Sequence, residues 1–174
     1  MNGLSTYAPL AAEAVAAIER REAQYPALIA LGKISSEQAE QEIRVWSAIA
    51  ADWHWVVTMQ RPDAPAATLQ EKIAAVQDSV SRADTALVRA FHRSDSSVRQ
   101  AFAVDMSFLE MEHRFGDAAM PFIDAWHRYH RFADLLKWYR RELPDSSRKP
   151  IAWFVDLHTQ AMKNPPHKAA RLAA

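Results

Sequence analysis

The sequence contains no cysteine and only three glycines among its 174 residues. The lack of cysteine excludes disulfide bonds, thiolate nucleophiles and thiolate metal ligands. So few glycines make a glycine-rich phosphate loop improbable, and neither a Gly-x-Gly-x-x-Gly nor a Walker-type motif occurs. The Gly-x-Ser-x-Gly motif of serine hydrolases and the His-Glu-x-x-His motif of metalloproteases are missing too. The common motifs of enzyme active sites therefore find no match in this chain.

The chain also lacks net charge and long apolar runs. Lys plus Arg equals Asp plus Glu at 21 each, so no overall field draws the protein towards nucleic acid or anionic lipid. No apolar run approaches the roughly 20 residues of a membrane span. The first 18 residues have no basic segment and include Glu13, which argues against a signal peptide. We therefore expect a cytoplasmic protein that does not contact membranes.

Residues that favour helices are abundant, and their pattern predicts an all-α protein of about six helices. Two helix starts are marked by capping boxes, one at Ser35 with Gln38 and one at Thr68 with Glu71. Apolar residues at helical spacing extend between these starts and the proline, glycine and serine clusters that end the helices. The expected helices cover about 9–24, 36–60, 69–93, 95–115, 118–143 and 150–164.

The proline-rich segment 61–67 is the one clear linker. It predicts an N-terminal helical hairpin, residues 1–60, followed by a four-helix, bundle-like region over 68–164. We expect these two parts to pack together as one globular unit. Residues 165–174 are expected to form a flexible tail.

The hairpin carries a recognisable series of residues: Arg20-Arg21, Tyr25-Pro26, Gly32-Lys33-Ile34-Ser35 and Ala39-x-x-Glu42-Ile43. Over residues 13–55 this series resembles short hypothetical proteins of bacteriophages and prophages. In that group a basic helix, a Tyr-Pro pair, a glycine turn and an Ala-x-x-Glu-Ile helix follow one another. The resemblance implies a phage or prophage origin and a helical hairpin, and it implies no particular activity.

Two charged residues fall on apolar faces of the expected hairpin. Arg21 lies at the helical spacing of Ala17 and Tyr25, and Glu42 lies at that of Trp46. Both lie at nearly equal distances along the chain from Gly32, so they should meet across the hairpin. Because an unpaired charge there would be costly, we predict a structural ion pair between Arg21 and Glu42. The alternative is that both side chains reach solvent.

A second set of polar residues falls on apolar stripes of the later helices. Asp105 and Glu112 lie seven residues apart in the expected helix 95–115, and His158 lies among apolar residues of the last helix. We predict a buried polar cluster of Asp105, Glu112 and His158 that is satisfied by protein groups. The alternative is a carboxylate–histidine metal site that also uses His113. Because the helical phases of the Glu-x-x-His and Asp-x-x-His pairs do not point inward together, we expect neither metal nor cofactor.

Three of the six tryptophans, Trp55, Trp138 and Trp153, fall on polar sides of their helices. Exposed tryptophans are enriched at interaction surfaces, so these three are our candidate surface for another protein or a second copy. The alternative is that neighbouring parts of the same chain cover them. A basic stretch over 128–149 offers a weaker alternative, binding of nucleic acid, although its side chains spread around the helix.

The sequence thus favours a non-catalytic, protein-binding helical protein. The second hypothesis is a metal-binding helical bundle or enzyme. Nucleic-acid binding through the basic stretch is the third.

Overall fold

The computed structural model describes residues 3–163 and contains seven α-helices, two short 3-10 helices and no strand within that range. The tail expected at 165–174 lies outside the described residues. The elements are η1 Gly3–Tyr7, α1 Ala8–Ala30, α2 Ser36–Thr58, α3 Leu69–Arg93, α4 Ser96–Ala103, α5 Phe108–Phe115, η2 Gly116–Ala118, α6 Met120–Arg140 and α7 Ile151–Lys163.

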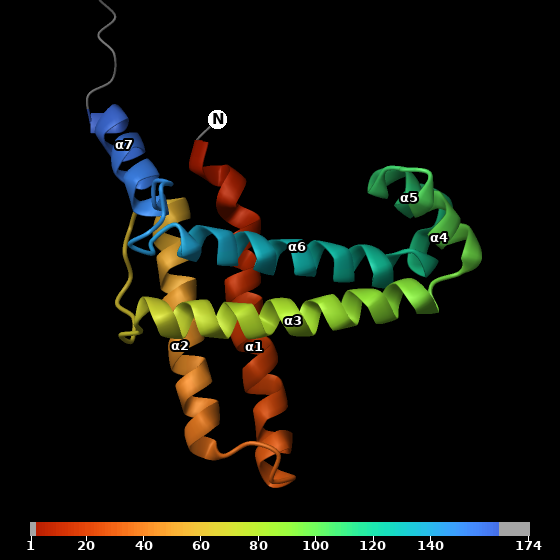
Figure 1. Ribbon diagram of the computed structural model, residues 1–174, viewed down its shortest axis with the longest axis horizontal. Coiled ribbons are helices and arrows are strands. Elements are labelled where there is room, and N and C mark those ends of the chain that lie inside the picture. The colour runs from red at the N-terminus through yellow and green to blue at the C-terminus, as the bar shows by residue number, and fades with distance from the viewer. Residues whose placement is uncertain (1–2, 164–174) are drawn as a thin grey trace, which may run out of the picture.

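Helices α1 and α2 form the expected antiparallel hairpin (Figure 1). Gly32 adopts a positive φ of 65° in the turn, a conformation that glycine reaches without steric cost. The Ser35 capping box then starts α2 as predicted. The first helix runs on through Pro26 to Ala30 and does not end near Gln24. A proline removes one backbone hydrogen bond, and burial of Tyr25 beside it offsets part of that loss.

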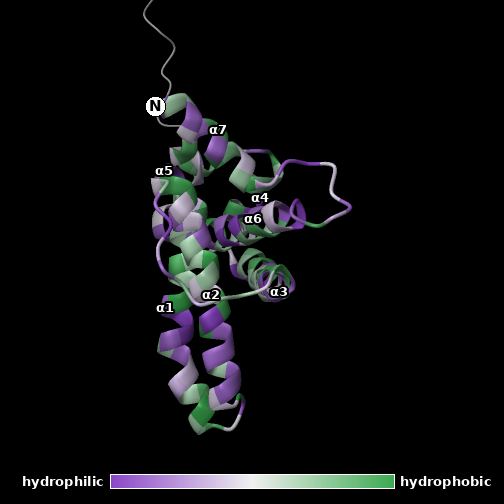
Figure 2. Ribbon diagram, turned by 90° about the vertical axis from the view of Figure 1, so that its left-hand side faces the viewer, coloured by the Kyte–Doolittle hydropathy of each residue, from purple (hydrophilic) through white to green (hydrophobic). Residues whose placement is uncertain are grey.

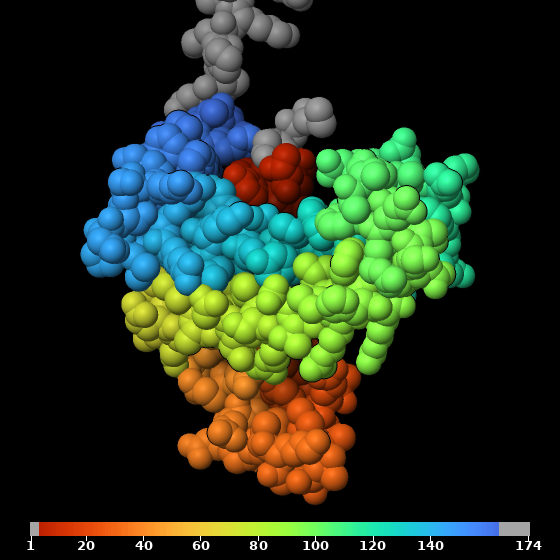
Figure 3. Space-filling model, turned by 45° about the vertical axis from the view of Figure 1, so that its right-hand side comes forward, coloured from red at the N-terminus to blue at the C-terminus, as the bar shows by residue number. Residues whose placement is uncertain are grey.

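Helices α3 and α6 form an antiparallel pair that lies across the hairpin (Figure 1). The pair crosses the half of the hairpin nearer its open end, so that the turn end projects beyond α3 as an arm. Figure 2 shows that the helices of this arm are largely hydrophilic, and Figure 3 shows α3 as a belt above the arm. The Thr68 capping box starts α3 as predicted.

Apolar side chains gather in two cores. The main core lies where the hairpin meets the helix pair and holds the fully buried Trp46, Ile49 and Trp53 of α2 with Leu135 of α6. A separate core lies at the far end of the helix pair, where α4 and α5 cover Phe122 of α6. The four-helix expectation for 68–164 therefore needs correction. Within residues 68–163 only α3 and α6 pair along their length, α4 and α5 lie at one end, and α7 packs on the hairpin at the other.

The single helix expected over 95–115 is in fact two. Helix α4 ends at Ala103, Asp105 adopts a positive φ of 56°, and α5 starts at Phe108. Ser107 and Glu110 form a capping box at this new start. The break lets the ring of Phe108 stack on that of Phe102, with 6.2 Å between their centres. The split raises the number of α-helices from the expected six to seven.

Candidate functional site

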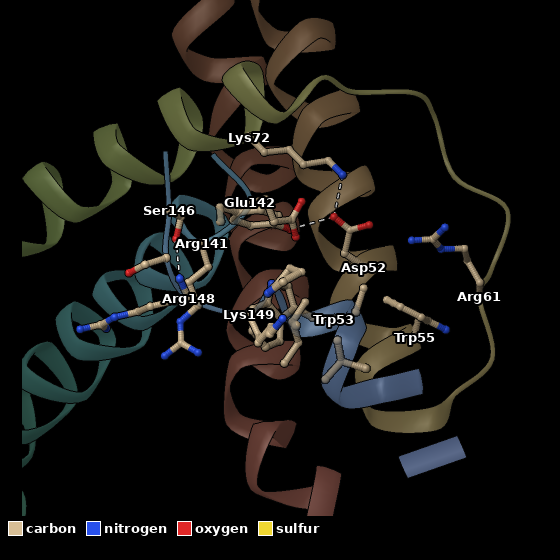
Figure 4. A pocket seen from close by; sticks show the side chains of 16 residues that line it. Asp52, Trp53, Trp55, Arg61, Lys72, Arg141, Glu142, Ser146, Arg148 and Lys149 are labelled. Carbon is tan, nitrogen blue, oxygen red and sulfur yellow. Dashed lines mark hydrogen bonds and ion pairs between the residues drawn. The ribbon is translucent and has the colours of Figure 1, made fainter. Parts of the chain in front are cut away.

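The largest group of candidate residues surrounds a cavity of about 580 Å³ near the C-terminal ends of α2 and α6 (Figure 4). The linker after α2, the start of α3, the loop after α6 and the first residues of α7 complete its walls. We call this region the α7 corner. Its lining consists of Asp52, Trp53, Trp55, Val56, Arg61, Lys72, Tyr139, Arg141, Glu142, Ser146, Ser147, Arg148, Lys149, Pro150, Ile151 and Ala152.

Each of the three predicted tryptophans carries a cation over its ring, although only Trp55 itself lines the cavity of the α7 corner. Arg61 lies 4.6 Å from the ring centre of Trp55, Arg141 lies 3.8 Å from that of Trp138, and Lys149 lies 5.9 Å from that of Trp153. All three cations line the cavity. A cation over an indole face is attracted by the ring quadrupole, so each pair holds its cation in place.

Only one of these tryptophans is exposed. Trp55 and Trp138 are half-buried, and Trp138 also contacts Tyr7 and Phe154 edge-on. Trp153 keeps 42% of its surface exposed. Trp55 and Trp138 are therefore partly covered by other parts of the same chain. The candidate interaction surface is then limited to Trp153 and its neighbours.

Helix α7 carries apolar side chains on two opposite faces. Ile151 and Val155 point into the main core and are buried. Trp153 and Leu157, four residues apart, stand on an outer face, with Leu157 51% exposed. Ala161 extends this outer stripe by one further turn and is exposed. A helix that is apolar on both faces has one face available for a partner.

Three residues of the cavity lining, Asp52, Lys72 and Tyr139, form a polar network. Asp52 accepts a hydrogen bond from Lys72 Nζ at 2.6 Å and another from the Tyr139 hydroxyl at 3.0 Å. Burial, reinforced by the neighbouring Asp52 carboxylate, raises the pKa of Tyr139 well above its ordinary value of 10.0. The phenol therefore remains a proton donor at neutral pH. Both hydrogen bonds end on Asp52 Oδ2 and join residues of α2, α3 and α6, so the network holds these three helices together.

Neither Asp52 nor Lys72 stands out in the sequence, because each has the phase of an ordinary half-exposed helix position. Their partnership depends on α2 and α3 crossing, which helical periodicity does not reveal. The basic stretch 128–149 contributes Arg141, Arg148 and Lys149 to this cavity, whereas Arg61 and Lys72 come from outside that stretch.

The structure brings Arg21 and Glu42 together across the hairpin. Arg21 Nε donates to Glu42 Oε2 at 3.2 Å, while its two terminal nitrogens donate to the Ala17 carbonyl at 3.0 Å and to Ser79 Oγ at 3.1 Å. The guanidinium also lies 4.5 Å from the ring centre of Trp46. Arg21 is only 8% exposed, so this one side chain joins both arms of the hairpin to α3.

Tyr25 completes the contact by donating its hydroxyl to the same Glu42 oxygen. Burial and this hydrogen bond raise the pKa of Tyr25 to about 12. Burial is also the main reason that the pKa of Arg21 falls below its ordinary value, and the arginine nevertheless stays charged at neutral pH. The arrangement is a structural clamp without a reacting group.

Sequence reasoning missed a second buried charge. Glu13 is only 4% exposed, and its carboxylate forms ion pairs with Arg20 Nη2 at 2.6 Å and with Arg131 Nη1 at 3.4 Å. The pair with Arg131 joins α1 to α6. Glu13 sits seven residues before Arg20, and this spacing places both on one side of the helix.

The predicted cluster of Asp105, Glu112 and His158 does not form. Asp105 and Glu112 are exposed at the α4–α5 end, and His158 is half-buried on α7 at the opposite end (Figure 1). The break at Asp105 shifts the phase of everything after it, which turns Glu112 and His113 outward. Across residues 3–163 no three histidine or carboxylate side chains lie together as metal ligands would. The set Asp105, Glu112, His113 and His158 is thus dispersed.

The basic stretch does not form one surface either. Arg131 pairs with Glu13, Lys137 with Asp134, and Arg140 Nη2 donates to Gln77 Oε1 at 2.6 Å. The remaining cations divide between the α7 corner and a separate pocket lined by Arg128. A continuous track for a nucleic-acid backbone is therefore not built from this stretch.

Comparisons with known proteins give no match to a protein-family model, to a curated protein or to a solved structure. Within the part of the chain that the structure describes, no helix is both long enough and apolar enough to cross a membrane.

Proposed function

We propose that this chain is a non-catalytic binding protein that contacts another protein through the outer face of α7. The observation that carries the proposal is the exposed stripe of Trp153 and Leu157 on a helix whose opposite face is already buried. Burying this stripe would recover about 25 cal/mol for each Å² removed from water. The neighbouring cations of the α7 corner would form the polar rim of the contact.

The occupant that we propose first is a second copy of the chain. The stripe is apolar along its length, so it is complementary to itself, and two copies with no net charge do not repel one another strongly. The resemblance of residues 13–55 to phage and prophage proteins supports a phage or prophage origin. A cytoplasmic location agrees with the lack of cysteine.

The double variant Trp153→Ala/Leu157→Ala tests the proposal. Sedimentation velocity over a concentration series should show dimers for the natural sequence and monomers for the double variant, with both unfolding alike in denaturant. Leu109→Ala is the matched control, because Leu109 is also exposed but lies on α5 at the other end of the molecule. A natural sequence that remains monomeric throughout, or an equal loss with Leu109→Ala, would contradict the proposed contact.

A further inference from the structure

A second pocket, of about 240 Å³, lies where α1, α3 and α6 meet. Four arginines line it: Arg20 and Arg21 from α1, Arg82 from α3 and Arg128 from α6. No acidic side chain belongs to its lining. Because all four arginines stand on helices that pack against one another, their backbones hold them around one small volume.

The buried member of this group has unused donors. Three of the five N–H groups of Arg21 are occupied by Glu42, the Ala17 carbonyl and Ser79. The other two have no acceptor among residues 3–163. Ser79, also buried and lining the pocket, accepts from Arg21, and its own hydroxyl hydrogen has no acceptor within the same range. Buried donors normally find an acceptor, so this set favours an acceptor from outside the chain.

The charges around the pocket leave one cation uncompensated. Glu13 pairs with Arg20, Glu42 with Arg21, and Asp78 with Arg82. These three carboxylates stand outside the lining. Arg128 has neither an ion pair nor a hydrogen-bonded partner among the described side chains. The lining thus holds four guanidinium groups, and the carboxylates that pair with three of them do not belong to it.

We propose that this four-arginine pocket binds a phosphate group, either as inorganic phosphate or as the phosphomonoester of a small molecule. Arginine is suited to this task because its planar fork matches the oxygens of phosphate in a bidentate way. The apolar side chains of Leu28, Ala83, Ala86 and Phe132 also belong to the lining, and they reduce the competition from water. This site lies apart from the α7 face and does not depend on the function proposed for it.

Binding is tested with inorganic phosphate and with ribose 5-phosphate by titration calorimetry and by the thermal unfolding midpoint, using chloride and acetate at equal ionic strength as references. A ligand that binds only the folded state raises the unfolding midpoint with its concentration. We expect saturable binding of phosphate with no comparable effect of acetate. Equal affinity for the two phosphates would identify the free ion as sufficient. Tighter binding of ribose 5-phosphate would identify the ester as the ligand class.

Arg128→Gln is the first variant, because Arg128 is exposed and has no partner among the described residues, so its loss leaves the fold intact. We expect phosphate to bind at least about fivefold more weakly, as for loss of one charge-assisted hydrogen bond. Arg89→Gln is the matched control, since Arg89 lies two turns beyond Arg82 on the same face of α3 but lines a different pocket. No saturable binding of either phosphate by the natural sequence, or the same weakening with Arg89→Gln, would overturn the proposal.

Discussion

Arg21 and Glu42 join the two arms of the hairpin, with 3.2 Å between Arg21 Nε and Glu42 Oε2. The two partners differ in burial, since the Arg21 side chain is buried and that of Glu42 is partly exposed. Arg21 also keeps two neutral acceptors, the Ala17 carbonyl and Ser79 Oγ. Loss of Glu42 therefore leaves the arginine incompletely satisfied but not isolated.

Replacing Glu42 with alanine should lower the free energy of unfolding by about 1–2 kcal/mol, the range for a hydrogen bond to a charged group at a partly exposed site. Denaturation by urea measures this change. Glu40→Ala is the matched control, because Glu40 is exposed on the same helix and has no partner among the described residues. An equal effect of the two substitutions would show that the clamp contributes nothing.

Tyr25 should make the protein sensitive to alkali. Its pKa rises from 10.0 to about 12 in the fold, chiefly through burial and then through its hydrogen bond to Glu42. Because the fold favours the neutral phenol, its contribution to stability is complete below pH 10 and declines as pH rises from 10 towards 12. Unfolding free energies measured across this range should fall more steeply for the natural sequence than for Tyr25→Phe. Parallel curves would contradict the assignment.

Glu13 should matter more to stability than its place near the start of the chain suggests. Replacing Glu13 with alanine removes the acceptor shared by Arg20 and Arg131 and should cost about 2 kcal/mol, the scale for a charged hydrogen bond. Urea denaturation of Glu13→Ala, compared with the exposed Glu19→Ala on the same helix, provides the measurement. A loss no larger than that of the control would show that the buried position gives Glu13 no special weight.

Local signals in the sequence predicted the hairpin well. The capping boxes at Ser35 and Thr68 each involve residues three apart, and both form. The Arg21–Glu42 contact could be placed because the two arms are antiparallel and Gly32 marks their centre. Such features depend only on neighbours along the chain or on one short turn.

The sequence predictions that proved wrong, and the contacts that the sequence did not reveal, share a physical cause. The Ser107–Glu110 capping box was present in the sequence, but the apolar stripe around it suggested an unbroken helix. An unbroken helix over 95–115 would place Asp105 and Glu112 on its buried face, whereas in the structure both are exposed. The Asp52–Lys72 pair and the α7 corner could not be predicted, because they depend on how separate helices cross.

The central claim, that α7 presents a face to another copy, is tested most directly by fluorine NMR of protein labelled with 5-fluorotryptophan. Trp153→Phe assigns one of the six tryptophan signals, and dilution then reports which indoles change surroundings. We predict that the Trp153 signal shifts with protein concentration while the signals of the buried Trp46 and Trp53 stay fixed. A Trp153 signal that does not change between dilute and concentrated protein would contradict the claim.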